Sequence, residues 1–198
     1  QAIIDAAESL KSPVILQTTP GTLGYAAPAL FAATVSAAAQ AASVPVAMHL
    51  DHGNSYALAV SALRAGYTSI MFDGSRHTLE ENISLTAKVT ELCGPVGIPV
   101  EGELGKVGGK EDTLEDSGTG YTDPDEAVRF VQESGVSSLA IGVGTAHGIY
   151  AETPKLNIPL ISAIRERLDI PLVFHGASGL SDDVLRQCIQ SGISKINF

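Results

Sequence analysis

Short runs of β-branched or apolar residues alternate with segments of helical periodicity along the whole chain. This alternation is typical of repeated strand-helix units that build a parallel sheet. The predicted strands are Val14–Gln17, Val46–Leu50, Ser69–Phe72, Val100–Glu103, Leu139–Gly142, Leu172–Phe174 and Lys195–Phe198. The predicted helices between them are Ala26–Ala42, Ser55–Ala65, Leu79–Cys93, Pro124–Ser134, Asn157–Leu168 and Asp182–Ser191.

Seven strands are one fewer than a (β/α)8 TIM barrel contains, and such barrels run to about 250 residues. The chain has 198 residues, begins in a helical pattern and ends in a predicted strand. We therefore predict one α/β domain, residues 1–198, that is a TIM barrel truncated at both ends, with the first strand and the last helix missing. An open doubly wound sheet is the alternative, but no G-x-G-x-x-G follows an early strand.

Composition excludes several classes of partner. The net charge is -10, and a nucleic-acid or anionic-membrane surface needs basic stripes, so we expect neither partner. The two cysteines, Cys93 and Cys188, form no disulfide framework, which favours a reducing compartment and predicts a cytoplasmic protein. The uncharged stretch Ser12–His49 is rich in alanine and reads as strand, helix and strand rather than as a membrane span.

One segment, Gly105–Thr122, shows neither the hydrophobic periodicity of a helix nor that of a strand, and it is rich in glycine and acidic residues. Irregular segments of this length in compact domains tend to be lids or binding loops. We predict a loop whose glycines act as hinges and whose acids carry chemistry, with a solvated surface loop as the alternative.

Three of the five histidines stand at predicted strand ends and are each followed by glycine: His52, His147 and His175. Strand ends of a barrel converge on one mouth, so three histidines there predict a catalytic zinc site with an open coordination position. A single histidine of this kind would more often be structural. Strict alternation turns Asp51 and His52 to opposite faces, so both reach the site only if the chain is leaving the strand there.

Carboxylates and glycine-rich turns accompany the histidines. Asp51 and Asp73 follow predicted strands, Glu101 and Glu103 flank Gly102 on another, and Glu111 and Asp112 lie in the irregular segment. A rigid acid and an acid on a mobile loop can serve as separate proton carriers. Two turns, Thr18–Thr22 and Gly176–Gly179, can bind phosphate groups through hydroxyls and backbone N–H groups, although a simple tight turn is as good an interpretation of each.

These motifs together resemble the class II, zinc-dependent ketose-bisphosphate aldolases, and the match covers essentially the whole chain. They are L-D-H-G at Leu50–Gly53, E-x-E-L-G at Glu101–Gly105, G-G-x-E-D at Gly108–Asp112, G-T-A-H-G at Gly144–Gly148 and H-G-A-S-G at His175–Gly179. The resemblance implies reversible cleavage of fructose or tagatose 1,6-bisphosphate to dihydroxyacetone phosphate and glyceraldehyde 3-phosphate.

The resemblance also implies roles for single residues. His52, His147 and His175 would bind one catalytic Zn²⁺ per chain, with Asp73 and Glu103 at an alternative metal position. Asp51 would exchange the proton of the C4 hydroxyl, and Glu111 the proton at C3. The residues implied around the substrate are Gly148, Gly176, Ala177, Ser178, Asn197 and, more loosely, Thr19. A monovalent cation often sits near the same glycine loops, and the full-length form would be a homodimer or homotetramer.

Rival interpretations remain at this point. Lys195 at a predicted strand could be the Schiff-base nucleophile of a class I-type aldolase, although the three His-Gly pairs would then be unexplained. A metal-dependent hydrolase barrel lacks its usual His-x-His pair here, because His49 and His52 are three residues apart. A catalytically inactive barrel fragment that only binds sugar phosphates is the non-enzymatic alternative.

Overall fold

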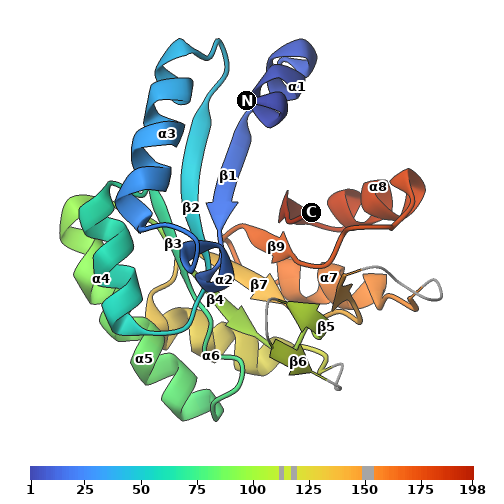
Figure 1. Cartoon of the computed structure of the whole chain (residues 1–198). Coiled ribbons are helices and arrows are strands. Elements are labelled where there is room, and N and C mark those ends of the chain that lie inside the picture. Colours follow the sequence, from blue (N-terminus) through green and yellow to red (C-terminus); the bar gives the residue numbers. More distant parts are fainter. Residues whose placement is uncertain (112–113, 117–119, 149–153) are drawn as a thin grey trace.

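A curled parallel sheet of seven strands forms a half-barrel in the computed structural model, which describes residues 1–111, 114–116, 120–148 and 154–198, with the backbone alone at 108–111 and 114–116 (Figure 1). The strand order is β1-β2-β3-β4-β7-β9-β10, and every neighbouring pair is parallel. The strands are β1 (Val14–Thr18), β2 (Val46–Gly53), β3 (Ser69–Phe72), β4 (Val100–Leu104), β7 (Ser138–Ile141), β9 (Leu172–Phe174) and β10 (Ile193–Ile196).

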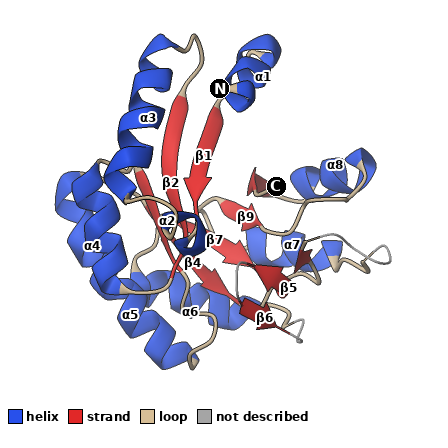
Figure 2. Cartoon of the chain, viewed as in Figure 1, coloured by secondary structure: helices blue, strands red, loops and turns tan. Residues whose placement is uncertain are grey.

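Helices cover the outer face of this sheet and follow one another in chain order, apart from the four-residue α2, which lies at the end of β1 (Figure 2). They are α1 (Ala2–Leu10), α2 (Pro20–Leu23), α3 (Pro28–Ala41), α4 (Tyr56–Ala65), α5 (Leu79–Cys93), the 3-10 turn η1 (Gly94–Val96), α6 (Pro124–Ser134), α7 (Ile158–Arg165) and α8 (Asp182–Gln190). Their starts are fixed locally, because the side chains of Ser55, Thr78, Asp123 and Asn157 accept hydrogen bonds from first-turn N–H groups.

The predicted alternation of strands and helices is confirmed, and two predictions about local structure are wrong. The last strand is β10 (Ile193–Ile196), which begins and ends two residues earlier than predicted. The N–H of Asn197 still donates to the carbonyl of Phe174 on β9, and the Asn197 side chain turns into the sheet interior toward Asp51. The segment Gly105–Thr122 is not wholly irregular. It contains the antiparallel strands β5 (Gly108–Glu111) and β6 (Leu114–Asp116), and β5 also pairs with β8 (Ala146–His147).

The main core lies between the sheet and the helices, and Phe130 of α6 is one of its largest fully buried side chains. The ring of Phe130 packs so closely on β4 that a Cβ at Gly102 would lie 2.7 Å from it. Glycine at this position therefore lets the helix approach the sheet. Among the described residues, no helix combines the length and the apolar character needed to cross a membrane.

Replacement of Phe130 by alanine is expected to lower the free energy of unfolding by about 3–5 kcal/mol, because it leaves a large cavity under a rigid sheet. Urea denaturation followed by circular dichroism measures this loss. Phe198→Ala is the matched control, since Phe198 is 78% exposed and its removal should change stability by less than about 0.5 kcal/mol. Equal effects of the two substitutions would contradict the packing described here.

Candidate metal centre

Asp51 and His52 lie at the C-terminal end of β2, where the strand departs from regular geometry. His52 has a left-handed backbone with φ of 46°, and the pairing of β2 with β3 shifts register between Leu50 and Gly53. A bulge of this kind breaks the strict alternation of side chains. Asp51 is therefore buried against the interior network while the neighbouring His52 reaches the other two histidines.

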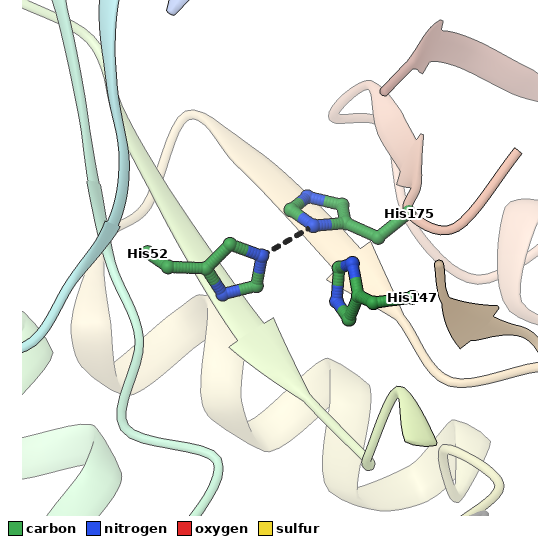
Figure 3. A group of neighbouring side chains, drawn as sticks. All are labelled: His52, His147 and His175. Carbon is green, nitrogen blue, oxygen red and sulfur yellow. Dashed lines mark hydrogen bonds between the residues drawn. The ribbon is translucent and has the colours of Figure 1, made fainter. Parts of the chain in front are cut away.

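The rings of His52, His147 and His175 meet at this end of the sheet (Figure 3). Their centroids are 5.0 Å apart for His52 and His147, 4.7 Å for His52 and His175, and 5.9 Å for His147 and His175. Each ring offers a nitrogen, and the three nitrogens lie within 4.8 Å of one another. The structure thus brings together residues that are 123 positions apart in the chain.

The donor set fits a zinc ion. His52 Nε2 and His175 Nδ1 face each other at 2.9 Å. A tetrahedral Zn²⁺ with bonds of about 2.0–2.1 Å to nitrogen holds its ligand atoms about 3.3 Å apart, so a small adjustment of the rings accommodates the ion. The opposite nitrogen of His52, Nδ1, lies 2.8 Å from Asp73 Oδ2, which is the outer partner that a metal-binding histidine normally has.

Asp73 and Glu103 lie beside the histidines, and the pKa values of their carboxyl groups are shifted in opposite directions. Burial raises the pKa of the Asp73 carboxyl, but hydrogen bonds from His52 and Ser75 outweigh burial and hold that pKa below its ordinary range. Burial, followed by the negative charge of Asp73, raises the pKa of Glu103 well above its ordinary value. Glu103 Oε2 is buried without a hydrogen-bond partner among the described residues. With His52, these two acids form a second group whose geometry could hold a cation.

Asp51 is held by two amides. Its Oδ2 accepts a hydrogen bond of 2.6 Å from Gln17 Nε2, and its Oδ1 accepts one of 3.1 Å from Asn197 Nδ2. Gln17 lies on β1 and Asn197 follows β10, so the two edge strands of the sheet both reach this carboxylate. A carboxylate held in this way is fixed in position and remains an acceptor for a substrate proton.

Three interior residues near the site, Gln17, His49 and Glu101, have no role in the set that the resemblance implies. Glu101 accepts from Lys195 Nζ at 2.8 Å and lies 3.0 Å from His175 Nε2. Burial alone raises the pKa of Glu101, but His175 and Lys195 outweigh it and lower the pKa. Burial, together with the charge of Lys195, lowers the pKa of His49 to about 4. The sequence indicates a site role for Glu101 only through its position two residues before Glu103 on the same strand. Nothing in the sequence indicates such a role for Gln17.

The glycine-rich segments make close backbone contacts. Gly176 has φ of +75°, and a Cβ there would lie 2.6 Å from the carbonyl oxygen of Ala146, so glycine lets the loop after His175 pass beside the strand that carries His147. The N–H of Ala177 donates to the carbonyl of Asn197, while Ser178 is exposed ahead of α8.

The remaining predicted site residues lie around this centre or outside it. Gly148 follows β8 with φ of +93°. The hydroxyl of Thr19 accepts from the N–H of Thr22 and so caps the short helix α2. Glu111 ends β5, whose Gly109 pairs with His147, and its side chain lies outside the described residues, as does Asp112.

Comparison with proteins of known sequence gives one consistent result. The family model for class II fructose-bisphosphate aldolase matches residues 1–198. An uncharacterized protein of Escherichia coli K12, YdjI, is 44% identical over 199 residues, which span 99% of this chain and 71% of YdjI.

Solved structures agree with the sequence match. The crystal structure of the YdjI aldolase has a TM-score of 0.88 at 41% identity, with 99% of this chain and 69% of that chain covered. A candidate fructose-1,6-bisphosphate aldolase of Coccidioides immitis has a TM-score of 0.91 at 35% identity, with coverage of 99% and 70%. The fructose-bisphosphate aldolase of Campylobacter jejuni has a TM-score of 0.79 at 26% identity, with coverage of 100% and 67%. Because the family model matches every residue, the chain belongs to the class II fructose-bisphosphate aldolase family.

Proposed function

We propose that the protein is a zinc-dependent aldolase that reversibly cleaves a ketose 1,6-bisphosphate into dihydroxyacetone phosphate and glyceraldehyde 3-phosphate. The observation that carries the proposal is the convergence of His52, His147 and His175 within ligand distance of one another, beside the amide-bound carboxylate of Asp51. Membership of the aldolase family supports a lyase reaction at this centre.

In the proposed mechanism, His52, His147 and His175 hold the metal, and Asp51 removes the proton of the C4 hydroxyl as the C3–C4 bond breaks. The amides of Gln17 and Asn197 keep the Asp51 carboxylate in place. Bound Zn²⁺ supplies a Lewis acid for the negative charge that develops on the ketone oxygen. Glu111 returns a proton to C3, and its position on a strand paired with that of His147 favours this role.

The proposal extends to substrate contacts and assembly. Gly148, Gly176, Ala177, Ser178 and Asn197 would bind the dihydroxyacetone phosphate half, with Thr19 at the second phosphate. Asp73 and Glu103 would offer an alternative metal position, and a monovalent cation would sit near the glycine loops. The curled seven-stranded sheet supports a TIM-barrel-like fold. The protein would assemble as a homodimer or homotetramer and act in the cytoplasm, as the resemblance to the aldolases implies.

A cleavage assay tests the proposed function. The protein is incubated with fructose 1,6-bisphosphate or tagatose 1,6-bisphosphate, and dihydroxyacetone phosphate is measured with a coupled dehydrogenase. We expect release from at least one substrate, loss of release after EDTA treatment, and recovery when Zn²⁺ is restored. Activity that survives the chelator and is trapped by borohydride would indicate a Schiff base on Lys195 instead. Binding of dihydroxyacetone phosphate without cleavage would indicate the inactive sugar-phosphate-binding alternative.

A further inference from the structure

A buried ionic group adjoins His175 of the candidate metal centre. Its centre is Glu101 of β4, which is 2% exposed, and Lys195 of β10 reaches it from across the half-barrel. The two strands are separated by β7 and β9 in the sheet order, so the ion pair joins side chains across the interior rather than along a ladder. The proposed reaction leaves this pair without a task.

The contacts of Glu101 constrain the neighbouring histidine. Its Oε2 accepts from Lys195 Nζ at 2.8 Å, and its Oε1 lies 3.0 Å from His175 Nε2. An ionised carboxylate can only accept hydrogen bonds, so Nε2 must carry the proton that joins it to Oε1. A neutral imidazole has one N–H, and the lone pair of His175 is therefore on Nδ1.

This tautomer matters for metal binding because of where Nδ1 lies. Nδ1 is the atom that faces His52 Nε2 at 2.9 Å in the candidate metal centre. The amide Nδ2 of Asn197 also lies 3.2 Å from His175 Nε2, and one of its two N–H groups donates at 3.1 Å to Asp51. The shorter contact of Nε2 is with Glu101, which as an ionised carboxylate has no hydrogen to donate and so requires the proton on Nε2. With a proton on Nε2, the contact between Asn197 and His175 is not a hydrogen bond, and Glu101 alone accepts from this ring nitrogen among the described residues.

We infer that Glu101, fixed by Lys195, is a positioning residue that holds His175 in the Nε2–H tautomer, so that Nδ1 presents its lone pair to the metal. The inference rests on the proposed zinc site. Outer carboxylates of this kind orient a histidine ligand and raise its basicity, and their loss typically costs about 10–100-fold in metal affinity.

The tautomer can be read in the wild-type protein before any substitution. The zinc-free protein is labelled with ¹⁵N, and long-range ¹H–¹⁵N spectra of its histidine rings are recorded at about pH 8, above the ordinary histidine pKa of about 6.5. We expect the His175 ring to show a protonated Nε2 and an unprotonated Nδ1. A protonated Nδ1 in the neutral ring would overturn the inference, whatever the activity of the enzyme.

Glu101→Gln is expected to shift the His175 ring from the Nε2–H to the Nδ1–H tautomer. The glutamine oxygen should turn to Lys195, since an amide NH2 cannot face an ammonium group, and the NH2 then donates to His175 Nε2. The proton of the ring moves to Nδ1, and the dissociation constant for Zn²⁺ should rise by about 10–100-fold in a competition titration. Glu80→Gln, on the exposed surface of α5, is the matched control and should leave zinc affinity unchanged.

The double variant Glu101→Gln with Lys195→Met separates positioning from simple damage. Without the ammonium group, the glutamine oxygen is free to accept from His175 Nε2, so both the Nε2–H tautomer and most of the zinc affinity should return. A double variant that is as weak as Glu101→Gln, although folded by circular dichroism, would contradict the inference. The ring spectra need neither zinc nor substrate, so their result is independent of whether the protein cleaves a bisphosphate.

Discussion

Asp51→Ala is expected to lower kcat for bisphosphate cleavage by about 10²–10⁴-fold, the range typical of a lost general acid-base group. The carboxylate is 1% exposed and is held at both oxygens by the amides of Gln17 and Asn197. The zinc content should stay the same, because Asp51 is not among the residues that form either candidate metal group in the described part of the chain.

Two measurements on purified Asp51→Ala test this expectation, namely the rate of dihydroxyacetone phosphate release and the zinc content per folded chain. Asp51→Asn is a useful companion, since it keeps the shape of the side chain, cannot take a proton, and should be nearly as slow. Glu80→Gln should retain the wild-type rate, because Glu80 is an exposed residue of α5. A wild-type rate in Asp51→Ala would refute the assignment of this residue as the proton carrier.

The order of strands and helices could be predicted from the sequence because each unit is specified locally. Strands such as Ser69–Phe72 are apolar runs, and α5 begins at a Thr78 capping box with Glu81. The hairpin of β5 and β6 could not be predicted in this way. Its residues are mostly glycine and charged, so neither strand has an apolar alternation to detect, and the pairing of β5 with β8 depends on a strand 35 residues or more away.

The three histidines could be predicted as a cluster because the ends of parallel strands converge at one edge of a sheet. The bulge at His52, with its positive φ, allows Asp51 and His52 to act in the same region. From the sequence one can infer only that the chain must leave regular strand geometry there if both side chains are to reach the site. The resemblance to class II aldolases supplied the roles of these residues, and the family match is consistent with it.

The residues around the histidines are harder to predict because they act across the interior. Gln17 reaches Asp51 from a position 34 residues earlier, and Lys195 reaches Glu101 from 94 residues later. No spacing rule links such pairs, since only the curl of the sheet brings the side chains together. Lys195 illustrates the difference, because its place at a strand suggested a Schiff-base nucleophile, whereas the structure shows its ammonium group donating to a buried carboxylate.

His147→Ala should reduce bound zinc from about one ion per chain to a small fraction after dialysis against metal-free buffer. Loss of a residue that only hydrogen-bonds a metal ligand weakens metal binding by up to about 100-fold. Loss of one of the three ligands themselves should therefore weaken zinc binding by more than about 100-fold. His147 is the most informative of the three ligands to remove. Removal of His175 would also take a hydrogen-bond donor from buried Glu101, whereas His147 is only half-buried on the short strand β8.

Thermal unfolding provides a second readout, because a ligand that binds only the folded state stabilises it by about 2.7 kcal/mol at 100 times its dissociation constant. Added zinc should therefore raise the Tm of the wild type and leave that of His147→Ala nearly unchanged. His77→Ala is the matched control, since His77 is a histidine with a 48% exposed side chain outside the cluster, and this variant should retain both zinc and the shift in Tm. If His147→Ala kept one firmly bound zinc, the metal would have to be held elsewhere, and the group of His52, Asp73 and Glu103 would be the next site to test by substitution.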